Sequence, residues 1–247
     1  MWEFEVISDQ SGREYIKYLQ ANLGELVSKL NGVMAIMTDG ENLFLSIGAK
    51  QENAPEIKAH LRLLLCDIFC EKMKLVYISD NLDLPENKQD LMTTFVKVCT
   101  YFDRETERQI VMKTLLLKDK KMHLQSFLRF KLQGLMQKWQ ELCDLVNQNS
   151  GTILKQENFI ELLRFLLNSI DSKCQSVILE LHDKCLIYHD IKSDFDVITA
   201  IDVENMYDIL SKIIDLNPYL IKIYATQDNS ELVSLLRSVF DDKVQLG

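Results

Sequence analysis

The sequence has 247 residues, of which 47% are hydrophobic and 26% charged, and its three prolines and eight glycines exclude a collagen-like or largely disordered chain. Its net charge of −9 predicts that it repels nucleic acid and anionic membranes on average. The N-terminus is acidic and alternating, and the apolar runs are far too short to cross a bilayer, so we expect a cytoplasmic protein without membrane insertion.

Residues 1–85 predict a small α/β unit. Apolar and acidic residues alternate from residue 2 to residue 6, which is typical of a half-buried strand. Apolar residues three and four positions apart then predict an amphipathic helix up to about residue 30. We expect a capping box of Ser11 and Glu14 at its start.

A hairpin and a second helix follow in the same unit. Two short apolar strands, 33–37 and 43–47, flank an Asp-Gly pair, which favours a tight turn. Pro55 fits the first turn of a helix that we expect to run to about residue 72.

Residues 86–170 predict a mostly helical segment. Turn residues cluster at 81–86 and mark a boundary before this segment, because the apolar periodicity pauses there. Within it, apolar residues recur at helical spacing, with interruptions at 118–121 and 149–151.

Residues 171–247 predict a C-terminal β-hairpin followed by a βαβ-like segment. Strands 176–181 and 186–189 form the hairpin, and a helix capped by Asp202 leads to a strand at 220–225. Strands that alternate with helices predict crossovers onto one small sheet. The fold class that we expect is therefore α+β, with a small α/β unit, a mostly helical middle and a C-terminal α/β segment.

The cysteine and histidine residues do not match a metal motif. We interpret the six cysteines as reduced thiols, because the chain is long and rich in core residues. Cys66 and Cys70 share a helix face, but two thiols alone are a poor zinc site. His182, Cys185 and His189 flank the hairpin, and the sequence leaves open whether they converge. We expect no metal and no cofactor.

A basic stretch lies in the middle of this acidic chain. Residues 113–138 hold seven cationic residues against one acid, Asp119, so the local charge is 7 − 1 = +6. The cations are Lys113, Lys118, Lys120, Lys121, Arg129, Lys131 and Lys138. They predict a patch that binds an anion or nucleic acid, or a solvated face, or a positive surface that docks against acidic helices of the same chain. We favour the solvated face or the docking surface, because runs of charge on protein surfaces are common. We expect Phe127, Phe130 and Trp139 to be core residues, because they have helical spacing.

Three sequence patterns carry a resemblance to a known family. They are Phe-Leu-Arg-Phe-Lys-Leu at 127–132, Phe-Ile-Glu-Leu-Leu-Arg-Phe-Leu at 159–166, and Pro-Tyr-Leu-Ile-Lys-Ile-Tyr at 218–224 with the Glu-Leu-Val and Val-Phe-Asp-Asp-Lys-Val segments that follow it. Together they resemble the YtxC-like family of sporulation proteins from endospore-forming bacteria. Lys131 and Asp241 differ, because the family has arginine and glycine there. The resemblance implies a cytoplasmic protein connected with sporulation and implies no reaction, cofactor or catalytic residue.

The sequence contains no familiar catalytic motif. A Gly-x-Gly-x-x-Gly loop, a Walker loop, a Gly-x-Ser-x-Gly elbow and a His-Glu-x-x-His pair are all missing. We therefore predict a sporulation-associated, non-enzymatic interaction or regulatory protein that acts on a protein partner. The alternative is a nucleic-acid-binding accessory protein that uses residues 113–138, and an unrecognised enzyme ranks third.

Overall fold

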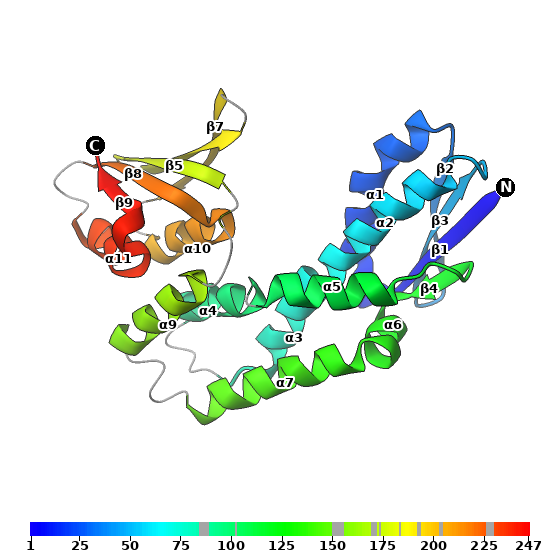
Figure 1. Cartoon of the computed structure of the whole chain (residues 1–247), viewed down its shortest axis with the longest axis horizontal. Coiled ribbons are helices and arrows are strands. Elements are labelled where there is room, and N and C mark those ends of the chain that lie inside the picture. The colour runs from blue at the N-terminus through cyan, green and yellow to red at the C-terminus, as the bar shows by residue number, and fades with distance from the viewer. Residues whose placement is uncertain are drawn as a thin grey trace. The chain divides into compact units, whose positions relative to one another are not determined.

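The computed structural model (Figure 1) describes residues 1–83, 89–101, 103–149, 156–168, 172, 174–182, 184–191, 194–202, 205–225 and 230–247. It contains two mixed sheets and helices, so the predicted α+β class is confirmed. The chain divides into two compact units, one of Met1–Asp80 with Asp103–Leu142 and one of Asn81–Phe102 with Cys143–Gly247. The helical segment predicted at 86–170 therefore supplies residues to both units.

The first unit contains a four-stranded sheet with the order β2-β3-β1-β4. Strands β1 (Trp2–Asp9), β2 (Val33–Asp39) and β3 (Asn42–Ala49) are antiparallel neighbours, and the short β4 (Lys121–His123) joins β1 in parallel. The alternation predicted for the first strand is confirmed, because every second side chain of β1 is buried. The Asp-Gly hairpin is also confirmed, with Gly40 at a φ of 58°.

The first unit also contains helices, some of which contact the sheet and others of which contact one another. They are α1 (Arg13–Lys29), α2 (Ala54–Asp67), a π-helical turn at Ile68–Met73, α3 (Lys74–Asn81), α5 (Arg104–Thr114), α6 (Leu124–Lys131) and α7 (Gln133–Gln148). Helix α1 packs across β1, β2 and β3, and α2 packs beside α1. The last residue of α3 and the last turns of α7 belong to the second unit.

The start of α1 differs from the prediction. A 3-10 turn at Gln10–Gly12 precedes the helix, and Asp9 accepts hydrogen bonds from the Gly12 amide, at 3.1 Å, and from the Ser11 hydroxyl. The capping box predicted at Ser11 and Glu14 is therefore wrong. Asp9 is the N-cap of the 3-10 turn, and α1 begins only after this turn, at Arg13.

The second unit contains a five-stranded sheet with the order β7-β6-β5-β8-β9. The antiparallel strands are β5 (Cys174–Leu181), β6 (Lys184–Ile191) and β7 (Asp194–Asp202), and β8 (Pro218–Ala225) and β9 (Val244–Leu246) continue the sheet in parallel. The predicted hairpin and βαβ-like segment are confirmed. Strand β7 was not predicted, and Asp202 ends it instead of capping the next helix, whose N-cap is Asn205.

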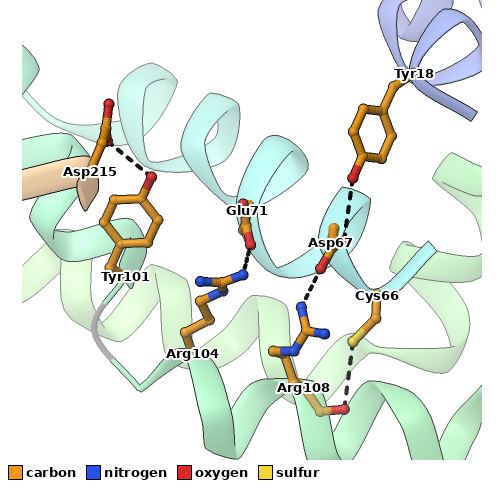
Figure 2. Close-up of polar contacts among 8 residues, drawn as sticks. All are labelled: Tyr18, Cys66, Asp67, Glu71, Tyr101, Arg104, Arg108 and Asp215. Atoms are coloured by element: carbon orange, nitrogen blue, oxygen red, sulfur yellow. Dashed lines mark hydrogen bonds and ion pairs between the residues drawn. The ribbon is translucent and has the colours of Figure 1, made fainter. Parts of the chain in front are cut away.

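Four helices in the described part of the second unit accompany this sheet. They are α4 (Gln89–Tyr101), α9 (Gln156–Asn168), α10 (Met206–Leu216) and α11 (Ser230–Phe240). The Phe95 and Phe159 rings lie 5.8 Å apart and join α4 to α9. Asp215 on α10 accepts hydrogen bonds from Lys97, at 3.2 Å, and from Tyr101, at 3.0 Å (Figure 2). No helix among the described residues is both long and apolar enough to span a bilayer.

Candidate anion-binding cleft

All seven cations of the predicted patch are exposed and belong to the first unit. They follow the chain from the end of α5 through β4 and α6 into α7, in the order Lys113, Lys118, Lys120, Lys121, Arg129, Lys131 and Lys138. Within the described ranges, none of the seven forms an ion pair. No ion pair among the described residues therefore supports docking against acidic helices of the same chain, whereas the exposure of all seven side chains fits a solvated face.

Four of these lysines line one cleft of about 640 Å³, which we call the lysine cleft. They are Lys113, Lys118, Lys121 and Lys131. Among the described lining residues Asp119 is the single acid, so their charge is 4 − 1 = +3. Lys120 and Lys121 also border a smaller hollow of about 410 Å³, beside Glu3 and Glu5. Folding thus brings four of the seven predicted cations together in the lysine cleft, whereas Lys120, Arg129 and Lys138 do not line it.

Apolar side chains form much of the wall of the lysine cleft. Phe130 is 73% exposed and Leu116 is 59% exposed, although both are large and apolar. Phe127 is half-buried, with its ring 5.3 Å from that of Phe69. The interpretation of Phe130 as core is wrong, because the short helix α6 buries Leu124 and Leu128 and turns Phe130 outward. Trp139 is core as predicted, with 1% of its surface exposed.

The connection between α5 and β4 places the lysines at the edge of the sheet. Helix α5 ends at Thr114, and Leu115 and Leu117 are buried while Leu116 between them is exposed. Leu117 has a φ of 44°, a left-handed conformation that is unfavourable for leucine and is held here by burial. The chain then adds β4 to β1, and the Glu5 amide donates to the Lys120 carbonyl at 2.9 Å.

Two polar side chains orient α6 at the other wall of the cleft. The His123 ring Nδ1 accepts from the Ser126 amide at 3.5 Å and so caps the helix. The Gln125 amide Nε2 donates to Ser8 Oγ at 2.8 Å and to Asp9 Oδ1 at 2.9 Å, at the end of β1. These bonds tie α6 to a strand more than a hundred positions earlier in the sequence, and so hold Phe130 and Lys131 at the cleft.

The lysine cleft has the chemistry of a binding site for a ligand that is both anionic and apolar. Lysine ammonium groups act as flexible point charges for carboxylates or phosphates, and exposed leucine and phenylalanine accept an apolar group. Asp119 and His123 are the acid and the imidazole among the described lining residues, and His123 already caps α6. The cleft therefore supports binding and provides no arranged acid, base and nucleophile.

A second polar cluster is enclosed between helices of the same unit. Lys74 and Glu107 are 1% and 4% exposed, and Lys74 Nζ lies 2.9 Å from Glu107 Oε1. Trp139 Nε1 donates to the same oxygen at 2.8 Å. Burial raises the pKa of Glu107, although Lys74 and Trp139 act in the opposite direction. Because both charged side chains are buried, we interpret this cluster as a contact that stabilises helix packing and not as a ligand site.

Two further ion pairs clamp α5 onto the end of α2 and the π-helical turn. Arg108 pairs with Asp67, which also accepts from the Tyr18 hydroxyl at 3.3 Å, and Arg104 pairs with Glu71 (Figure 2). These contacts are not among the features predicted from the sequence. A signal was present, since two acids four positions apart and two arginines four positions apart match on antiparallel helices.

Whether His182, Cys185 and His189 converge can be followed only in part, because the side chain of His189 lies outside the described residues. Cys185 is completely buried on β6, whereas His182 is exposed at the turn between β5 and β6. His189 pairs with Val177 along the strands, four positions beyond Cys185. No group of three or more metal-ligating residues occurs among the residues that the structure describes. Cys66 and Cys70 are buried thiols.

Comparison with known proteins gave no match to a family model, to a curated protein or to a solved structure.

Proposed function

We propose that this chain is a non-enzymatic interaction or regulatory protein that binds an acidic segment of a partner protein in the lysine cleft. The observation that carries the proposal is the convergence of four lysines beside the exposed side chains of Phe130 and Leu116. These four lysines form no ion pair with any residue that the structure describes. An exposed apolar patch with a charged rim is characteristic of protein interfaces. The resemblance to the YtxC-like family adds endospore formation in the cytoplasm as the cellular setting of this proposal.

The charge distribution supports an acidic partner that binds in one orientation. The basic stretch carries +6 within a chain of −9, so the rest of the chain carries −9 − 6 = −15. An acidic partner is repelled by most of this surface and attracted at the cleft, and such a contrast favours one docked orientation. The aromatic ring of Phe130 is suited to contact an apolar anchor of the same segment.

Site-specific photo-crosslinking in sporulating cells tests the proposal. A photoreactive phenylalanine analogue at position 130 is expected to capture one discrete partner protein. The double variant Lys118→Glu/Lys121→Glu should abolish this adduct, because it reverses two charges of the cleft. The matched control Lys17→Glu/Lys29→Glu makes the same charge change on exposed positions of α1 and should retain it. Absence of an adduct, or equal loss in the control, would reject the proposal.

Nucleic-acid binding is the second candidate function, and the exposure of Phe130 beside lysines favours it. Single-stranded nucleic acids are bound by positive grooves in which aromatic rings stack on bases. We expect from this candidate that a single-stranded oligonucleotide binds at about 50 mM salt and dissociates steeply as salt is raised. Lack of salt-sensitive binding to both DNA and RNA would eliminate this candidate and leave the protein partner.

A further inference from the structure

In the described part of the chain the two sheets have four edge strands, and one of them is unprotected. Strands β4 and β9 have only three residues each, which is one way in which proteins protect a sheet edge. Strand β7 carries aspartates at 194, 196 and 202, and its pairing with β6 is irregular. Strand β2 has seven residues and no proline, lysine or bulge. Its first five residues are uncharged and apolar, with the sequence Val33-Met34-Ala35-Ile36-Met37.

The apolar side chains of β2 are also unusually exposed. Val33 is 68% exposed, Met37 54% and Ile36 37%. The ladder to β3 runs without interruption from Val33 opposite Gly48 to Asp39 opposite Asn42, so β2 is straight and in register. Within the described residues, β3 is the only strand that pairs with β2. The outward main-chain groups of β2 are therefore available to a further strand, and such edges recruit one readily.

We propose that a second copy of this chain pairs with β2, antiparallel and about a two-fold axis at Ala35. Residue i of one copy then lies opposite residue 70 − i of the other, so Val33 faces Met37 and Ala35 faces Ala35. The two four-stranded sheets become one continuous sheet across the dimer. This contact is isologous, because each copy contributes the same surface.

The sequence of β2 fits a second copy better than an unrelated strand. The smallest side chain of the apolar run, Ala35, lies at the axis, where two identical residues meet most closely. The one charge of β2 is Asp39, which this register places opposite Asn31. The two Asp39 residues are then eight positions apart along the strands, about 26 Å. Pairing centred nearer to Asp39 would bring two carboxylates together, so charge favours an axis at Ala35 over one closer to Asp39.

Sedimentation velocity over a range of protein concentrations tests the dimer. The full chain is expected to shift reversibly from monomer to dimer, because one strand pair makes an interface smaller than that of a permanent dimer. Ala35→Lys should raise the dissociation constant at least tenfold, since it places two ammonium groups face to face. Ala21→Lys, the same change on the exposed side of α1, should dimerise like the unmodified chain. A monomer at every concentration, or equal dimerisation of Ala35→Lys, would overturn the proposal.

Disulfide cross-linking tests the register and does not depend on the lysine variant. In an antiparallel pair, opposed Cα atoms are about 4.5–5.5 Å apart, which is within the range of a disulfide. Ala35→Cys should therefore form a covalent dimer under mild oxidation. Thr38→Cys should not, because the two positions would be about 20 Å apart. Equal cross-linking of both variants, or none in Ala35→Cys, contradicts pairing at Ala35. The outcome is independent of the lysine cleft, which lies beside the opposite edge strand β4.

Discussion

At the scale of single residues, the buried Lys74–Glu107 pair is the main electrostatic feature of the first unit. Removing two charges from water is costly, and the 2.9 Å contact together with the Trp139 hydrogen bond offsets part of this cost. Together with Trp139, the pair links three helices, because Lys74 lies at the start of α3, Glu107 on α5 and Trp139 on α7. We infer that it specifies how the three helices pack more than it adds to the free energy of unfolding.

Glu107→Gln is expected to lower the free energy of unfolding by about 3–5 kcal/mol, because the Lys74 ammonium stays buried without the carboxylate. Lys74→Met/Glu107→Gln should recover most of this loss, since the glutamine oxygen still accepts from Trp139 and the methionine fills the space. Urea unfolding followed by tryptophan fluorescence measures both, because Trp2 and Trp139 both lie in the first unit. Similar losses in the single and double variants would contradict this account.

The cysteines differ in their access to reagents. Cys66, Cys70, Cys99, Cys143 and Cys185 are buried, and Cys174 is partly exposed. Burial raises the pKa of Cys143 and raises that of Cys185 to about 12. Such thiols stay protonated at neutral pH, whereas reagents attack the thiolate. At pH 8 we expect about one equivalent to react rapidly in the native chain and all six after denaturation. Rapid reaction of three or more would contradict the burial.

At the scale of elements, the junction of β1 and α1 controls the position of α6. The side chains of Ser8 and Gln125 fill the space around Gly12, so a Cβ at Gly12 would lie 1.9 Å from Ser8 Oγ and 2.8 Å from Gln125 Nε2. Glycine is therefore required here by close approach. Displacing Gln125 would also break its hydrogen bond to Ser8, which holds α6 against β1. Phe130 and Lys131 of α6 line the cleft.

Gly12→Ala is expected to destabilise the first unit by about 1–3 kcal/mol through this overpacking. Gly24→Ala is the matched control in the interior of α1, where the new Cβ would meet only the Met34 methyl, at 3.5 Å. It should stabilise by about 0.5–1 kcal/mol, because alanine favours the helix. Urea denaturation of the two variants should therefore shift in opposite directions, and shifts of the same sign would contradict the packing around Gly12.

At the scale of the whole molecule, each compact unit is built from two separate segments of the chain. The first unit combines residues 1–80 with 103–142, and its hydrophobic core contains Val111, Leu115 and Leu124 from the second of these segments. A boundary near residue 85, as the sequence suggests, would therefore separate β1 from β4 and α2 from α5.

A fragment of residues 1–85 is expected not to fold alone, because it lacks the buried side chains of α5, α6 and α7. Adding a fragment of residues 103–148 should restore a cooperative unfolding transition and the fluorescence of a buried Trp139. Cooperative unfolding of the 1–85 fragment by itself would show that the first unit does not need the second segment. The complementation also serves as the control for damage caused by truncation.

The sequence by itself determined the features that depend on neighbours along the chain. Alternation identified β1, the Asp-Gly pair identified the β2–β3 hairpin, and Pro55 identified the start of α2. These features were predictable because spacings of two and about 3.6 residues are local properties of strands and helices. The composition and the basic stretch at 113–138 were also visible in the sequence. The sequence did not show which of these cations line one cleft.

Only the tertiary structure decided which distant segments meet. The parallel pairing of β4 with β1, the ion pair of Arg108 with Asp67 and the lysine cleft all join residues that are far apart in the sequence. Phe130 has the spacing of a core residue, yet it is exposed, because α6 is short and buries its other side. Local patterns show which face of an element is apolar, whereas long-range packing decides which other element covers that face. No element covers Phe130 in the described part of the chain.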